Sequence, residues 1–539
     1  RGMRETLKNY LEAYYRELLD ISKTAKLNFD RRQWEDQRKL NVDRIRLWPQ
    51  YVSQILNDGK IKDNAEWQEI RNSMLWSVTC IPNPELIALL LDLDRYFGFY
   101  HYDIISSEAL VPSRYDDDLQ IKNHYAFYDQ LALIVMSHTI FESPFQNPER
   151  DKKMLADQFK ILLNGAKGEL KAYSSLFYRN QHAYLIARLY AEGKSWPIAI
   201  PFINHSDGIV VDDFLFKEEQ LINIFEFTRS YFLVESPDPV LLINFLVEVM
   251  PQKTKHQLII NLGFQRWGKA LQEMEFRKFY VKHPFSKLIE AQGIKGMVMI
   301  VFTMDGLPFV FKIVKDKIKP PKETNRSKVI ERYGFVASHD RVGRFADAQL
   351  YRSLLFPRQA FDKDLIDEIK EQAPSSIEIR QDNVLIHHVF TERKMVPLNI
   401  FLEKAQREEA EKVTIDYGNA IKEMAMSNIF PGDLLIKNFG VNESGKVVFY
   451  DYDEVVQLTE CNFRKMPEAK DEDDYWDDEV RITVNDNDIF PEELAGFVPP
   501  PAPYRELFLT HHKDLFQPDF WKKWKQFHLD GGFMDIQPY

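Results

Sequence analysis

The stretch Pro431-Gly432-Asp433-Leu434-Leu435-Ile436-Lys437-Asn438 decides how the chain is interpreted, together with Val447-Val448-Phe449-Tyr450-Asp451-Tyr452-Asp453 shortly after it. Asn438 lies five positions after Asp433, and Asp451 lies thirteen positions after Asn438. The apolar run that begins at Val447 fits a buried strand, which places Asp451 at its end. The pattern predicts a loop, a short hairpin and a second loop that bring these three polar side chains together.

The hairpin needs a tight turn between its strands, and Asn442-Glu443-Ser444-Gly445 supplies one. Phosphoryl transfer by protein kinases uses this set of residues in this order. An Asp accepts the hydroxyl proton, an Asn holds one Mg²⁺, and an Asp after the next strand holds metal under the phosphates. A surface hairpin with solvated carboxylates explains the stretch equally well, so the residues upstream decide between the two.

Length and composition limit the number of domains and the class of protein. The 539 residues predict two to four domains, and 45% hydrophobic with 13% aromatic residues indicates a packed globular protein. The net charge of −12 argues against a nucleic-acid binder and against an anionic membrane surface. Two cysteines, Cys80 and Cys461, suit a reducing cytoplasm and leave no thiolate metal site. No apolar run approaches 18 residues and no signal-peptide core is seen, so we expect a cytoplasmic protein without a membrane span.

The first half, to about residue 284, has mostly helical periodicity. Two short β patterns, Trp196–Ile200 and Gly208–Val211, flank a turn and predict a hairpin. By position, this half is expected to be a regulatory or substrate-docking domain. Helices are predicted near 40–57, 64–78, 83–98, 126–142, 150–165 and 169–192.

The pattern changes near residue 285. A small glycine loop, Gly293 to Gly296, runs into an apolar strand, and Asp305-Gly306 turns the chain into a second strand that carries Lys312. Such a loop lets the backbone close over phosphates, and a lysine on the next strand can reach them. In isolation the pair also fits an antiparallel hairpin with an edge lysine.

Further pieces follow in a consistent order. An ionisable cluster spans His339 to Asp347, an apolar strand starts at Val384, and Glu392–Leu398 suits a hinge that would meet an adenine. A helix with an apolar stripe from Tyr417 to Ala425 then delivers the chain to the Asp433 loop. Each piece is weak alone, but the ordered set predicts a two-lobed enzyme that uses ATP.

These stretches carry a family resemblance. Gly293–Met297, His339–Asp347, Arg393–Asn399, Asn428–Val441 and Val448–Glu454 resemble the isocitrate dehydrogenase kinase/phosphatase family. The resemblance is nearly full length and is densest from about 288 to 460. It implies an α+β fold, with a mostly helical N-terminal regulatory domain (1–284) followed by a two-lobed kinase-like domain (285–539). The small lobe would cover about 285–392 and the large lobe about 398–539.

The resemblance also implies roles for individual residues. Asp347 would be the acidic active-site residue associated with the phosphatase reaction, and Asp433 and Lys437 would be catalytic. Asn438, Asp451 and Asp453 would hold metal. The ATP site would comprise Ala291, Gln292, Gly293, Ile294, Lys295, Gly296, Met297 and Lys312.

Departures from ordinary protein kinases are visible. Pro431-Gly432-Asp433 replaces His-Arg-Asp, and Asp451-Tyr452-Asp453 replaces Asp-Phe-Gly. Without an Arg before Asp433, control by a small ligand or by substrate docking is favoured over activation-loop phosphorylation. The acidic partner of Lys312 is left open between Glu323 and Glu331.

The family implies a bacterial enzyme that phosphorylates a serine of isocitrate dehydrogenase with ATP, inactivating it, and removes that phosphate at the same nucleotide site. It would thereby control flux between the tricarboxylic acid cycle and the glyoxylate bypass. ATP/ADP with Mg²⁺, or Mn²⁺ in its place, and AMP as an effector are implied. No nucleic acid or membrane partner is expected, and a homodimer is allowed. Two alternatives stay open, a catalytically silent kinase-like binding module and a small-molecule kinase with a helical cap.

Two features follow the second loop. The acidic run Lys470–Glu479 is predicted to be a solvated loop, with a substrate-facing role as the alternative. Aromatic residues near the end of the chain predict helices docked on the large lobe. They are Phe508, Phe516, Phe520, Trp521, Trp524 and Phe527.

Overall fold

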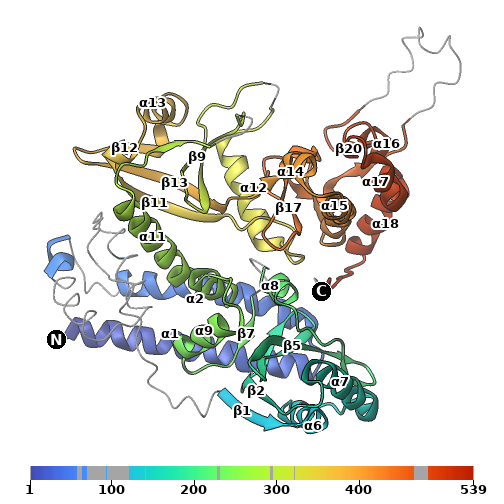
Figure 1. Ribbon diagram of the computed structural model, residues 1–539. Coiled ribbons are helices and arrows are strands. Elements are labelled where there is room, and N and C mark those ends of the chain that lie inside the picture. The colour runs from blue at the N-terminus through green and yellow to red at the C-terminus, as the bar shows by residue number, and fades with distance from the viewer. Residues whose placement is uncertain are drawn as a thin grey trace, which may run out of the picture. The chain divides into compact units, whose positions relative to one another are not determined.

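The computed structural model describes residues 2–57, 64–69, 93, 121–139, 141–226, 231–291, 295–320, 322–466, 484–537 and 539 (Figure 1). The chain forms two compact units, Arg1–Pro284 with Pro538–Tyr539, and Phe285–Gln537. Among the described residues, no helix is both long and apolar enough to cross a membrane. The helix predicted near 83–98 and the acidic run 470–479 lie outside the described residues, apart from Leu93.

The first unit begins with two long helices that pack along each other, α1 (Gly2–Asp30) and α2 (Trp34–Asn57) (Figure 1). Their shared face is aromatic: the rings of Tyr14 and Trp48 meet edge to face with centroids 5.2 Å apart. The described segment 64–69 is also helical. Apolar residues at helical spacing therefore fold as predicted here.

The first unit also contains an antiparallel sheet of seven strands in the order β1-β2-β4-β3-β7, with β5 joined to β4 and β6 to β5. Helices cover both of its faces, since Leu185 packs with α6 and α7 while the neighbouring Ile186 packs with α8, α9 and α10. The strands are β1 (Ile121–Ala126), β2 (Gly168–Tyr173), β3 (Phe177–Arg179), β4 (His182–Ala191), β5 (Lys194–His205), β6 (Gly208–Val211) and β7 (Leu233–Val234). The helices are α6 (Tyr128–His138), α7 (Pro148–Leu163), α8 (Glu218–Ile224), α9 (Pro239–Val249), α10 (Lys255–Asn261) and α11 (Gln265–Lys282).

One prediction for this unit is wrong. Residues 169–192 form β2, β3 and β4, not a helix. The segment is apolar on both faces, so helical and strand periodicity cannot be told apart by pattern alone. Asn180 at φ 52° lies in the turn between β3 and β4, and Gly193 at φ 75° lies in the turn that ends β4. The predicted hairpin is confirmed, because β5 pairs with β6 from Phe202–Val211 to His205–Gly208.

The second unit starts with an antiparallel sheet in the order β11-β13-β10-β9-β8, with β12 on β13. In this sheet β10 lies between β9 and β13, which buries Lys312 at its centre. The elements are β8 (Leu288–Glu290), β9 (Met299–Met304), β10 (Phe309–Val314), α12 (Arg326–His339), β11 (Gln349–Pro357), α13 (Lys363–Gln372), β12 (Ile377–Ile379) and β13 (Asn383–Arg393).

The rest of this unit is built around α15 (Arg407–Met426), whose buried face packs on the hairpin β16–β17 and on α17. The predicted aromatic docking at the end of the chain is confirmed: Trp521 is fully buried, with Phe463 stacked 5.3 Å away. The remaining elements are β14 (Val396–Pro397), α14 (Leu398–Lys404), β15 (Ile429–Phe430), β16 (Phe439–Val441), β17 (Val447–Phe449), β18 (Val456–Gln457), β19 (Asn462–Phe463), β20 (Asp488–Ile489), α16 (Pro491–Leu494), α17 (Arg505–His512) and α18 (Pro518–Leu529).

Candidate functional site

The loop that carries Asp433 is fixed by the glycine before it. Gly432 has φ +79°, and a Cβ there would lie 2.4 Å from the carbonyl oxygen of Glu454. Only glycine fits such a close approach without strain. The contact extends the pairing of two short strands, because β15 ends just before Gly432 and β18 begins just after Glu454. The Asp433 loop is thus held directly against the turn that follows Asp453.

Asn438 is bonded both to the Asp433 loop and to Tyr450, the residue before Asp451. The Asn438 amide nitrogen donates to the Asp433 carbonyl at 3.1 Å, and the Tyr450 N–H donates to the Asn438 carbonyl at 3.1 Å. Between them β16 and β17 pair in the register Phe439–Phe449. The hairpin therefore sets Asp451 beside the loop that carries Asp433.

Lys312 reaches this loop from the sheet of β10. Its ammonium donates to the Tyr450 carbonyl at 3.1 Å and pairs with the Glu392 carboxylate at 2.6 Å. The prediction of Glu323 or Glu331 as the acidic partner is therefore wrong. In the β10–β13 register Lys312 faces Phe390 and Val310 faces Glu392, so lysine and glutamate are diagonal neighbours on one face.

Burial shapes the charges of this site. It raises the pKa of Asp453 to about 8, and the neighbouring Asp451 carboxylate adds to the effect. Burial also raises the pKa of Glu392, which the Lys312 ammonium only partly opposes. One buried oxygen of Asp453 and one of Glu392 have no hydrogen-bond partner among the described residues.

These orphaned oxygens test whether a divalent cation fits. A buried carboxylate that keeps an unpaired oxygen is expensive unless a cation or a proton meets it. The bond from the Asn438 nitrogen leaves its amide oxygen as the group for a cation, and oxygen ligands are those that Mg²⁺ prefers. Among the described residues, no group of three or more His, Cys, Asp or Glu side chains is placed to hold a metal ion.

Asp347 is placed by a strand-like segment before it. Phe345 forms a parallel bridge with Phe449, in which the Ala346 N–H donates to the Phe449 carbonyl at 2.9 Å. Gln349 donates to the Asp347 carboxylate. The Asp347 charge also contributes to the raised pKa of Glu392, as expected of a nearby carboxylate. Asp347 therefore lies on the same side of the hairpin as Asp451.

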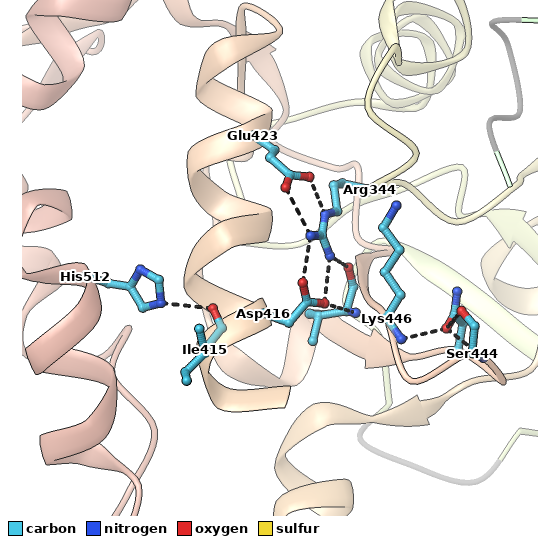
Figure 2. A network of polar contacts seen from close by, with 9 residues as sticks. Arg344, Ile415, Asp416, Glu423, Ser444, Lys446 and His512 are labelled. Carbon is cyan, nitrogen blue, oxygen red and sulfur yellow. Dashed lines mark hydrogen bonds and ion pairs between the residues drawn. The ribbon is translucent and has the colours of Figure 1, made fainter. Parts of the chain in front are cut away.

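A buried arginine fixes that segment, as Figure 2 shows. Arg344 bonds both oxygens of Asp416 at 2.7 Å each and those of Glu423 at 2.6 and 3.2 Å. It also donates to the Val447 carbonyl at 3.0 Å, and the Val447 N–H donates back to Asp416 at 2.7 Å. Burial alone would raise the pKa of Asp416, but the Arg344 guanidinium lowers it. The network ties α15, the start of β17 and the Asp347 segment together.

The other predicted residues are placed as follows. Lys437 lies in the short 3₁₀ turn Ile436–Asn438 with an exposed side chain, and its carbonyl accepts from the Tyr450 hydroxyl. Lys295 pairs with Glu368 at 2.7 Å. Ala291, Gly296 and Met297 flank the loop before β9, while Gln292, Gly293 and Ile294 lie outside the described residues.

The sequence interpretation missed a second lysine at this site. Lys322, in the segment between β10 and α12, pairs with the Glu454 carboxylate at 2.5 Å and lies 3.8 Å from the Asp433 carboxylate. Its surroundings in the sequence, Lys319-Pro320-Pro321-Lys322-Glu323, are those of an ordinary charged loop. No local signal in the sequence could have separated it from its neighbours.

Comparison with known proteins agrees with this geometry. The family model for the isocitrate dehydrogenase kinase/phosphatase (AceK) kinase domain matches residues 286–539, and the model for the regulatory domain of the same family matches residues 99–284. The chain belongs to the isocitrate dehydrogenase kinase/phosphatase family. It is thus an α+β protein in which a regulatory domain precedes a kinase domain, and a kinase domain uses ATP.

Curated relatives of this family extend the match along the whole chain. The isocitrate dehydrogenase kinase/phosphatase of Cupriavidus necator is 35% identical over 99% of this chain and 92% of its own length. That of Paraburkholderia phymatum is 36% identical over 99% of this chain and 93% of its own length.

Proposed function

We propose that this chain is a bifunctional enzyme that phosphorylates a serine of isocitrate dehydrogenase with ATP, inactivating it, and removes the phosphate at the same nucleotide site. It would thereby control flux between the tricarboxylic acid cycle and the glyoxylate bypass. The observation that carries the proposal is the meeting of three segments at one hairpin. The Asn438 amide bonds the Asp433 carbonyl, Lys312 donates to the carbonyl of Tyr450 next to Asp451, and the segment before Asp347 bridges to Phe449. The names of its relatives give the protein substrate.

In the kinase direction, Asp433 accepts the hydrogen bond and then the proton of the serine hydroxyl. Lys312 is held rigidly by Glu392 and the Tyr450 carbonyl, which aims its ammonium at the phosphates. Asn438, Asp451 and Asp453 would hold Mg²⁺, or Mn²⁺ in its place, which neutralises phosphate charge when bound. Positioning and electrostatics account for most of the rate in such a site.

In the phosphatase direction, Asp347 orients or deprotonates the attacking water. Its support is the bridge from Phe345 to Phe449, which brings Asp347 to the hairpin that carries Asp451. Lys437, whose ammonium is exposed, would act at the rim of the site. Ala291 to Met297 would close over the nucleotide.

We propose further that residues 1–284 regulate the enzyme and dock its substrate, and that AMP acts as an effector. Within 285–539 the small lobe covers about 285–392 and the large lobe about 398–539. The two cysteines support a cytoplasmic location, and a homodimer is compatible with this organisation.

The test is a pair of assays on the purified chain with isocitrate dehydrogenase. Phosphoserine should accumulate with ATP and Mg²⁺, and phosphorylated substrate should lose its phosphate when ADP or ATP is added. D347A should lose hydrolysis while it keeps most of its transfer activity. Equal loss of both activities would refute the role of Asp347. No transfer at all would favour a silent binding module, and transfer to a metabolite alone would favour a small-molecule kinase.

A further inference from the structure

Lys322 contacts the Asp433 loop from a segment more than 100 residues earlier in the chain. It precedes α12, and its side chain is only 18% exposed. The ammonium pairs with Glu454 at 2.5 Å and lies 3.8 Å from an oxygen of Asp433. The ammonium therefore lies between the carboxylate of Asp433, the proposed proton acceptor, and that of Glu454.

The two other lysines near this loop are placed differently. Lys312 is 7% exposed and is committed to Glu392 and the Tyr450 carbonyl. Lys437 is exposed and extends from the far end of the loop. Among the described residues, Lys322 is the lysine whose ammonium forms an ion pair with Asp433.

A cation beside a proton acceptor has a specific consequence. The arrangement becomes useful when the cation is shared with negative charge that develops on the phosphoryl group being transferred. Burial tends to lower the pKa of Lys322, but the carboxylates of Glu454, Asp451 and Asp433 raise it, which keeps the ammonium charged.

We propose that Lys322 is a catalytic residue that contacts the phosphoryl group during transfer, with Glu454 as its resting partner; this rests on the proposed function. In the transfer step the bond between the serine oxygen and the γ-phosphorus forms, and the bond from that phosphorus to the bridging oxygen of ADP breaks. The serine proton goes to Asp433. Lys322 keeps its proton throughout and supplies only positive charge.

The test compares K322M, K322R and E454Q with a matched control, K328M, since Lys328 is an exposed lysine on α12. ATP affinity, kcat and KM are measured on the full chain with isocitrate dehydrogenase. For K322M the kcat of transfer should fall by about 100-fold while the KM for ATP changes by less than about threefold, as expected when a transition-state contact is lost. The kcat of K322R should be about tenfold higher than that of K322M, and the kcat of K328M should match the wild type.

E454Q separates this role from a structural ion pair. If Lys322 served only to hold Glu454, E454Q and K322M would lose the same activity, and the inference would be overturned. We expect E454Q to keep kcat within about fivefold of wild type, since the resting partner is not used in the transition state. Thermal unfolding of each variant shows whether it folds. If K322M does not fold, the kcat of K322R is used instead to test the role of Lys322.

The outcome also separates this inference from the proposed function. A wild-type chain that transfers no phosphate to isocitrate dehydrogenase contradicts the proposed function. An active wild type with a K322M kcat within about threefold of it contradicts the role of Lys322 alone.

Discussion

Replacement of Arg344 by methionine should destabilise the second unit strongly. The guanidinium is 5% exposed and makes four bonds to Asp416 and Glu423, whose side chains are 26% and 22% exposed. Removal of one partner from a buried ion pair costs about 3–5 kcal/mol, because the other charge stays buried without compensation. The partly exposed carboxylates place R344M at the lower end, about 3 kcal/mol.

That loss can be measured in two ways. For a domain of this size, 3 kcal/mol lowers the midpoint of thermal unfolding by roughly 6–12 °C. Hydrogen exchange at the amides of α15 reports the second unit alone, and the protected amides there should exchange about 150-fold faster if they open with the whole unit. R352M serves as the matched control, since Arg352 is exposed on β11, and it should stay within about 0.5 kcal/mol of wild type.

A triple variant tests the cause. R344M/D416N/E423Q removes all three charges, so it should be more stable than R344M although each of the two carboxylates loses one acceptor oxygen. A loss below about 1 kcal/mol in R344M, or a triple variant no more stable than the single one, would refute the reasoning. R344M should also slow phosphate hydrolysis, because the same network anchors the segment before Asp347.

Other expectations can be checked on the same preparation. Burial lowers the pKa of His512 to about 4, whereas the same side chain in the unfolded protein has a pKa near 6.5. Below pH 6.5 the unfolded state therefore binds the proton first, and the free energy of unfolding decreases as the pH is lowered. From pH 7 to 5 His512 contributes about 2 kcal/mol to the loss of stability seen in urea titrations; H512Q should reduce the loss by that amount, and H511Q, a change at an exposed neighbour, should leave it unchanged. K312M should lose transfer activity and about 3 kcal/mol of stability, because it leaves the buried Glu392 carboxylate without its ion-pair partner. The double variant K312M/E392Q should recover the stability but stay inactive. An active double variant would contradict the role of Lys312. G432A places a Cβ 2.4 Å from a facing carbonyl at φ +79°, so urea unfolding should show a loss of about 2–3 kcal/mol and both activities should drop; wild-type stability would contradict the close approach.

Local chemistry was readable from the sequence because neighbouring residues dictate it. The hairpin from Phe439 to Phe449 needed only two apolar runs and a turn, and Asn442 does bond the Ser444 and Lys446 N–H groups as a turn residue should. The residue types and their order then pointed to phosphoryl transfer.

Where both faces of a segment are buried, local pattern fails. Residues 169–192 were predicted as a helix because their apolar residues fit either period, and pairing with β5 decides the matter. That pairing is a property of the folded sheet.

The proposed reactive set of Asp433, Asn438 and Asp451 could be read from the sequence, because a short hairpin joins these residues and local propensities suffice to form it. Two contacts emerge only in the folded protein: Glu392 pairs with Lys312, and Lys322 lies 3.8 Å from Asp433. The first depends on the register of two strands far apart in the chain, and the second on the path of a charged loop. Neither leaves a periodic trace in the sequence, since long-range contacts are selected by the packing of the whole domain.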